Sequence, residues 1–131
     1  MLRVKTTIKN SDVSGIGLFA DEFIPKGTVT WQYDEHIEPS FSIEQFESFS
    51  ELVKEHILIH GYFDHTTQRY VLCIDNQAFI NHSNTPNIES TPDADIAAQD
   101  IHPGEELTCN YRQYEHDWFE RRAQYNWSHF G

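Results

Sequence analysis

Hydrophobic and polar side chains alternate at the start of the chain. Leu2, Val4 and Ile8 fall on one side of an extended chain, where Thr6 completes the row, and basic or hydroxyl side chains take the other side. This period of two predicts a half-buried strand over residues 2–9. Further short extended segments, separated by turn signals rich in Pro, Gly and Asn, are predicted at residues 28–33, 69–74, 95–99 and 106–111.

A helix is predicted between residues 42 and 61. Ser42 and Gln45 fit a capping box at its start, and Gly61 supplies a stop signal at its end. The apolar positions near one face of this helix are Ile43, Phe46, Phe49, Val53 and Ile57. A second helix is predicted over about residues 113–124, where Tyr114 and Trp118 are four residues apart. The pattern as a whole predicts a mainly β domain with a helical insert and a helical tail.

The length of 131 residues favours one domain, residues 1–131. Nine Phe, six Tyr and three Trp residues supply the apolar area for a modest core. The two cysteines, Cys73 and Cys109, are too few for a disulfide framework. No stretch is apolar enough for a signal peptide or a membrane span, so we expect an intracellular, cytoplasmic protein without a membrane partner.

The chain is acidic, with nine Lys and Arg residues against twenty-one Asp and Glu residues and a formal net charge of −12 at pH 7. Because phosphate binding needs a positive surface, direct binding to nucleic acid is not expected. An acidic surface can attract a basic partner, and acidity serves solubility equally well.

The segment GIGLFA at residues 15–20 fits the pattern G-x-G-x-x-A of dinucleotide-binding turns. That interpretation requires a helix directly after the glycines, whose N-terminus faces the pyrophosphate. Here Pro25 and Gly27 follow where the helix would run, and both residues oppose a helix interior. The sequence therefore excludes a dinucleotide site at this turn.

Two later segments give the glycine turn another meaning. Residues 79–87 read FINHSNTPN and residues 105–111 read EELTCNY, after GIGLFA and the strand entry IPKGTV. Together these resemble the motifs of SET-domain protein lysine methyltransferases, in the family's order and over about residues 3–118. The resemblance implies a β-clip fold of small β-sheets with a knot-like C-terminal threading, an insert at about 34–77 and a helical tail at about 112–131.

The resemblance also implies S-adenosylmethionine as the cofactor and transfer of its methyl group to a lysine amine. It places backbone groups of Gly15, Ile16 and Gly17 close to the cofactor, where a side chain at either glycine would obstruct. It places Asn81 and His82 at the cofactor through an amide side chain and backbone groups. Because an aromatic ring can stack on adenine, Trp118 or Trp127 of the tail is a further candidate, and docking of the tail onto the core is an equal alternative.

Tyr111 corresponds to the catalytic tyrosine of the family, and Tyr33 to a tyrosine that lines the lysine channel. Core packing is an alternative role for each. Cys109 lies two residues before Tyr111, at a position that influences how many methyl groups the lysine receives. Since a cysteine is small, we expect dimethylation or trimethylation.

The chain departs from the family at its zinc site. Asn84 stands where many members have a zinc-binding cysteine, and no C-x-C-x4-C cluster follows Tyr111, so no metal is expected. His56 and His60 are four residues apart with His65 nearby, but the glutamate of an H-E-x-x-H motif is absent. We expect no metal site there either.

The implied partner is a basic protein carrying the target lysine, such as a histone, which would place the enzyme in a nucleus. Between residues 34 and 55 seven acidic residues face one lysine, which suits a basic peptide or a solvated helix face. Two other functions stay open: a catalytically inactive SET-like module that binds peptides, and an unrelated small β-clip domain. The protein is expected to be a monomer or a homodimer.

Overall fold

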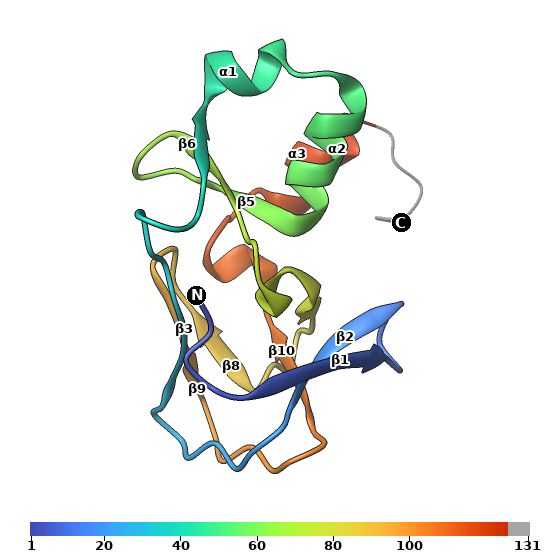
Figure 1. Ribbon diagram of the computed structural model, residues 1–131. Coiled ribbons are helices and arrows are strands. Elements are labelled where there is room, and N and C mark those ends of the chain that lie inside the picture. The colour runs from blue at the N-terminus through green and yellow to red at the C-terminus, as the bar shows by residue number, and fades with distance from the viewer. Residues whose placement is uncertain (126–131) are drawn as a thin grey trace.

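The computed structural model describes residues 1–125, whose strands form three small sheets (Figure 1). The sheets have the strand orders β1-β2-β10-β7, β3-β9-β8 and β4-β6-β5. Their strands are β1 (Thr6–Asn10), β2 (Ile16–Ala20), β3 (Val29–Gln32), β4 (Ser40–Ser42), β5 (Gly61–Asp64), β6 (Arg69–Leu72), β7 (Asn81–His82), β8 (Ile88–Ser90), β9 (Ala94–Ala97) and β10 (Glu106–Cys109). The helices are α1 (Ile43–Ser48), α2 (Glu51–His60) and α3 (Trp118–Ala123), with 3₁₀ turns η1 (Asn76–Phe79) and η2 (Tyr111–Gln113). A mainly β domain with short helices is confirmed.

The helix predicted between residues 42 and 61 is present as two helices. Its capping box is confirmed, because Ser42 Oγ accepts from the Gln45 amide at 3.1 Å and Gln45 Oε1 accepts from the Ser42 amide at 2.9 Å. Gly61 ends α2 as expected. The single continuous helix was wrong, because Phe49 is extended and Ser50 caps α2 by accepting from the Val53 amide.

The break in this helix turns two apolar side chains outward. Phe46 and Ile57 are buried as the pattern predicts, whereas Ile43 and Val53 are each 44% exposed. A serine side chain that bonds the backbone competes with the helix and starts a new one. Ser50, directly before Glu51, marks the start of α2, and this start was overlooked because the apolar periodicity continues across it.

The predicted strand at residues 2–9 begins later than expected. β1 starts at Thr6, and Leu2 forms only an isolated bridge with Trp31. Ile8 was expected on the buried side but is 38% exposed, because β1 is the outer strand of its sheet and pairs with β2 alone. The strands predicted at 28–33, 69–74, 95–99 and 106–111 correspond to β3, β6, β9 and β10.

The glycine turn joins two antiparallel strands, β1 and β2, so no helix follows it. Gly15 has φ +47°, a left-handed conformation that suits glycine, and its carbonyl accepts from the Ser11 amide at 2.8 Å. Gly17 lies inside β2, where an added Cβ would lie 2.4 Å from Glu106 Oε2. The exclusion of a dinucleotide turn is consistent with this hairpin.

The described residues form three buried hydrophobic clusters, and the two larger ones lie in the lower and upper parts of Figure 1. The third consists of Trp31, Tyr62 and Val71. The lower cluster centres on β2 and β10, with Leu18 and Leu107 fully enclosed. The upper cluster joins α1, α2, β5 and β6 through Phe46, Leu58 and Phe63. Among the described residues no helix is long and apolar enough to cross a membrane.

The C-terminal segment runs from η2 to α3 beside the upper cluster. The predicted helix over 113–124 is shorter than expected, because η2 and a turn precede Trp118. Arg122 fixes α3 by donating to both carboxylate oxygens of Glu115, at 2.8 and 3.1 Å, and to the Leu58 carbonyl at 2.8 Å. Both charged side chains are fully buried, so each depends on the other for compensation.

Candidate active site

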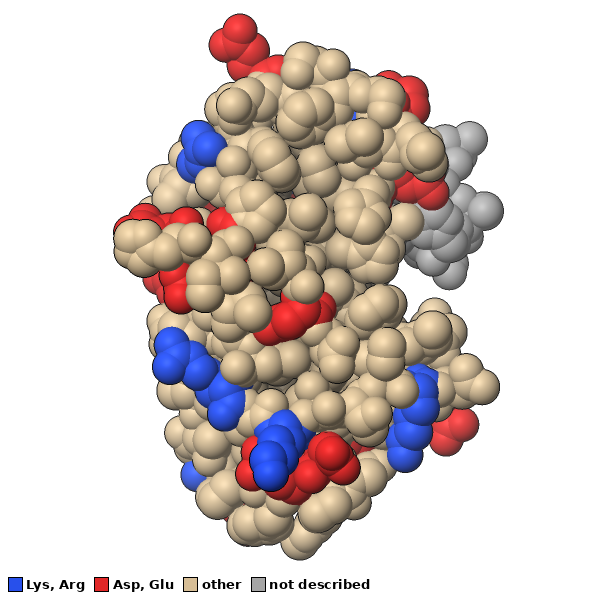
Figure 2. Space-filling view, in the orientation of Figure 1, with Lys and Arg blue, Asp and Glu red and all other residues tan. Residues whose placement is uncertain are grey.

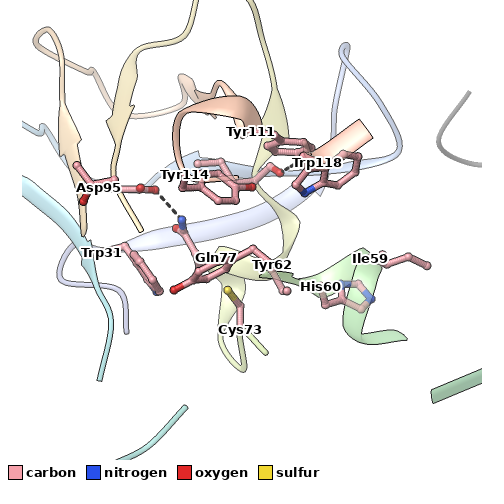
Figure 3. Close-up of a pocket in the computed structure, with 14 residues that line it drawn as sticks. Trp31, Ile59, His60, Tyr62, Cys73, Gln77, Asp95, Tyr111, Tyr114 and Trp118 are labelled. Carbon is pink, nitrogen blue, oxygen red and sulfur yellow. Dashed lines mark hydrogen bonds between the residues drawn. The ribbon is translucent and has the colours of Figure 1, made fainter. Parts of the chain in front are cut away.

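Two pockets of different size meet between the upper and lower clusters. The first, which we call the wide pocket, has a volume of about 490 Å³ and is lined by the β1–β2 turn, β7 and the start of α3. The second, the narrow pocket, has a volume of about 40 Å³ and includes several Tyr and Trp side chains in its lining (Figure 3). The residues that line both pockets are Ile59, His60, Ala78, Ile80, Tyr111 and Trp118.

Tyr111 lies at this junction because β10 ends two residues before it. The Asn110 side chain caps η2 by accepting from the Arg112 amide at 3.0 Å, which starts the turn at Tyr111. The Tyr111 hydroxyl donates to the Ile80 carbonyl at 2.6 Å. Burial raises the pKa of Tyr111, so the phenol stays protonated at neutral pH. With its hydrogen used, the phenol oxygen is left to accept a bond from another group.

The His82 side chain is hydrogen-bonded to the backbone of Tyr111. Its Nδ1 accepts from the Tyr111 amide at 3.1 Å, and its Nε2 lies 3.2 Å from Asn84 Oδ1. These two bonds fit the neutral tautomer that carries its proton on Nε2. The ring therefore holds the backbone of Tyr111, and Asn84, which replaces the family's cysteine, orients the ring.

Asn81 ties three segments together at the edge of the wide pocket. Its Nδ2 donates toward Ser11 Oγ, the Ser14 carbonyl and Glu106 Oε2, at 3.1, 3.0 and 2.9 Å. Ser11 also donates to Glu106. The Asn81 amide nitrogen thus holds the glycine turn against β10, and Gly17 provides the space for Glu106.

The predicted cofactor residues lie as follows. Gly15, Ile16, Asn81 and His82 line the wide pocket, and Trp118 lines both pockets. Gly17 does not line the wide pocket, and an added side chain there would meet Glu106 first. Phe119, which follows Trp118, also lines the wide pocket. Trp127 lies outside the described residues.

The narrow pocket has aromatic walls and one carboxylate. The aromatic residues are Trp31, Tyr62, Tyr111, Tyr114 and Trp118. Figure 3 shows Asp95 and Trp31 toward one end of the pocket and His60 and Trp118 toward the other. Tyr62 is anchored by donating its hydroxyl to the Pro92 carbonyl at 2.8 Å.

Asp95 is 3% exposed and accepts from Gln77 Nε2 at 2.7 Å. Burial raises the pKa of Asp95 from its usual 3.8 to about 6, although its hydrogen bonds oppose that change. Burial likewise lowers the pKa of His60, which lines both pockets. The narrow pocket is therefore an apolar space in which Asp95 is the acidic group that can face a cation.

Tyr33 and Cys109 lie away from the narrow pocket. Tyr33 lines a separate cleft of about 810 Å³, which we call the acidic cleft. Cys109 is fully buried in the lower cluster, two residues before Tyr111, and is not a wall of either pocket. A direct contact of Tyr33 or Cys109 with a bound lysine is thus not supported by their positions.

The acidic cleft opens beside the narrow pocket on the β8–β9 turn, where Thr91 lines the pocket and Asp93 lines the cleft. Its acidic residues are Asp34, Glu35, Glu38, Asp64 and Asp93, and Arg69 is its one Lys or Arg. On the face in Figure 2 the Lys and Arg side chains lie mostly in the lower half. Four acidic residues of the insert, Asp34, Glu35, Glu38 and Asp64, therefore lie in the acidic cleft.

Several pocket residues were not found from the sequence. Asp95, Gln77, Tyr62 and Trp31 belong to no motif, and they meet only when two sheets and the η1 turn are assembled. Tyr114 was placed on the predicted second helix, and its position in the narrow pocket was not predicted. A charged residue in the otherwise uncharged strand segment 95–99 was the one available signal for Asp95.

Comparison with known proteins shows the family and the fold of the chain. Residues 15–112 match the model of the SET domain family. No curated protein matches the sequence. The structure resembles a Plasmodium falciparum protein provisionally assigned as a histone methyltransferase, with a TM-score of 0.55 and 21% identity, over 84% of this chain and 95% of that one.

A second similar structure is a humanized mutant of the Chaetomium thermophilum Polycomb Repressive Complex 2 bound to an inhibitor. Its TM-score is 0.60 and its identity is 22%, over 86% of this chain and 15% of that chain. Identities this low show the shared fold, whereas the family model covers most of the present chain. The chain therefore belongs to the SET domain family.

Proposed function

We propose that the protein is a protein-lysine N-methyltransferase that uses S-adenosylmethionine and acts on a basic protein. The observation that carries the proposal is the meeting of a wide and a narrow pocket at Tyr111. A bulky cofactor and a single extended side chain need two such spaces, and a transfer between them needs a shared wall. Methyltransferase-type chemistry also fits the family to which the chain belongs.

The wide pocket suits the cofactor in size and in lining. Its volume of about 490 Å³ falls within the roughly 300–1,000 Å³ of ordinary ligand pockets. No atom lies within 4 Å of the place where a Cβ on Gly15 would lie, so its backbone is open to a ligand. Gly15, Asn81, His82 and Phe119 would hold the cofactor, which supplies a sulfonium methyl group when bound.

The narrow pocket would take the lysine side chain. A free lysine amine has a pKa near 10.4 and must lose a proton before it can act as a nucleophile. Loss of water around the amine in this narrow pocket disfavours the ammonium form, and Asp95 is the carboxylate in this pocket that can receive its proton. Tyr111, whose hydrogen is bonded to Ile80, would accept an N–H of the neutral amine and so orient its lone pair.

The substrate class follows from charge. The acidic cleft holds five carboxylates beside one arginine, next to the turn that walls the narrow pocket. Basic side chains flanking the target lysine would find complementary charge there, which favours encounter and register. A histone tail has this character, and one of the similar structures is assigned as a histone methyltransferase.

Mass spectrometry of the product tests the proposal. Wild-type protein is incubated with S-adenosylmethionine and a panel of lysine peptides with basic flanks, with Tyr111→Phe and Tyr33→Phe run in parallel. We expect the Tyr111→Phe rate to fall at least about 100-fold, since an orienting hydroxyl is lost at the reacting centre. Tyr33→Phe should stay within about threefold of wild type, because Tyr33 lines the cleft and not the narrow pocket.

The other outcomes discriminate further. Cofactor binding without transfer to any peptide of the panel would favour the inactive SET-like binding module. A product series that reaches dimethyl-lysine or trimethyl-lysine would support the expectation based on Cys109, and a series that stops at monomethyl-lysine would contradict it.

A further inference from the structure

Three potential metal ligands meet at the start of α3. His65 follows β5, while His116 and Asp117 directly precede Trp118, the first residue of α3. One ligand atom from each of the three side chains lies within 4.8 Å of the others. Among residues 1–125 this is the group of His, Cys and acidic side chains that could share an ion, and it does not include the His56 and His60 pair.

The Asp117 side chain bridges His65 and Arg121 of α3. Asp117 occupies the N-cap position of α3 but makes no side-chain capping bond. Its Oδ1 lies 2.8 Å from His65 Nε2, and its Oδ2 accepts from Arg121 at 3.1 Å. Arg121 fixes the orientation of this carboxylate through its second oxygen, as an outer hydrogen bond does at metal sites.

The two histidine rings are already side by side. Their centroids are 4.3 Å apart with an angle of 26° between the planes. Zinc holds ligand nitrogen and oxygen atoms at about 2.0–2.2 Å, which puts neighbouring ligand atoms roughly 3.3 Å apart. His116 is exposed, so a rotation of its side chain can bring its ring nitrogen to that separation from the other two ligand atoms. His65 binds through Nε2 once its neutral ring carries the proton on Nδ1.

We propose that His65, His116 and Asp117 bind one zinc ion, with water completing the coordination. Imidazole and carboxylate together suit zinc, whereas calcium and magnesium prefer all-oxygen sites. The ion would join the end of β5 to the start of α3, next to Trp118, which lines both pockets. The site is a structural clamp outside both pockets, so it holds whether or not the protein transfers methyl groups.

Titration of the untagged full chain with ZnCl2, after removal of metal with EDTA, tests the site. We expect one-to-one binding by calorimetry and a rise in the unfolding midpoint of about 5–10 °C at a hundredfold excess over Kd. CoCl2 should give the visible absorption of a low-symmetry site with nitrogen ligands.

His116→Ala and His65→Ala should each weaken zinc binding at least about tenfold. His116→Ala is the decisive variant, because this exposed side chain can be removed without disturbing the His65–Asp117 bond. His36→Ala, at another exposed histidine, should leave binding unchanged. Binding that survives His116→Ala and His65→Ala, or no binding by folded wild-type protein, would overturn the proposal.

Discussion

The wide and narrow pockets share six side chains yet differ in almost every other respect. The wide pocket is lined by a turn, a short strand and the start of a helix, and its backbone is exposed at Gly15. The narrow pocket is enclosed in part by aromatic side chains from two of the sheets and the C-terminal segment, with Asp95 beside them. The six shared residues can therefore contact a ligand in either pocket. The residues that line only one pocket distinguish the ligands that the two pockets would bind.

The largest effect, on the free energy of unfolding, is expected when Arg122, which holds α3 beside both pockets, is replaced. Arg122→Ala removes one of the two arginines that pair with the buried Glu115, leaving only Arg121, and it releases α3 from α2, so we expect a loss of about 3 kcal/mol of unfolding free energy. Urea denaturation measures this loss. Arg112→Ala is the matched control, since Arg112 pairs with Glu120 at the surface and should change the midpoint little. Equal losses in the two variants would show that the buried pair does not hold α3.

Asp95→Asn changes only the narrow pocket. Folding raises the pKa of Asp95 from 3.8 to about 6. The stability that the protonated Asp95 contributes is therefore fully present below about pH 4 and is lost as the pH rises through 6. The asparagine variant cannot ionise and should be about 1–3 kcal/mol more stable than wild type at pH 7.5. Urea denaturation at pH 4 and 7.5 measures the stability difference with Asp95 protonated and ionised. An asparagine variant less stable than wild type at pH 7.5 would refute the claim that the buried charge is destabilising.

Phe119→Ala changes only the wide pocket. Removing one aromatic wall should weaken S-adenosylmethionine binding about 3- to 10-fold, in line with roughly 0.5–1.5 kcal/mol for an aromatic contact. Calorimetry measures the affinity. Phe23→Ala removes a half-exposed ring outside both pockets and serves as the matched control. Unchanged binding in Phe119→Ala would place the cofactor elsewhere.

The smallest effect is expected outside both pockets. Ser50→Ala removes the cap of α2 and should cost about 0.5–1 kcal/mol of stability, with cofactor affinity unchanged. Thermal unfolding and calorimetry on the same sample measure both quantities. A change in cofactor affinity would mean that the end of α2, where Ile59 and His60 lie, is coupled to its start.

Motif residues and pocket residues differed in how far the sequence could place them. Tyr111, Asn81 and His82 lie in continuous motifs, so their positions beside the pockets were predictable. Asp95, Tyr62 and Gln77 come together only through sheet pairing, and no local pattern encodes that. The strand at Ile16–Ala20 was missed because its glycines suggested a turn, and the break at Ser50 was missed because the apolar periodicity continued across it.

Titration of the wild-type protein with S-adenosylmethionine by calorimetry tests the central claim most directly, because it needs no knowledge of the substrate. Binding at one site with micromolar affinity, weakened by Phe119→Ala and not by Phe23→Ala, is the predicted result. Absence of binding by folded protein would contradict the assignment of the wide pocket and, with it, the proposed transfer through Tyr111.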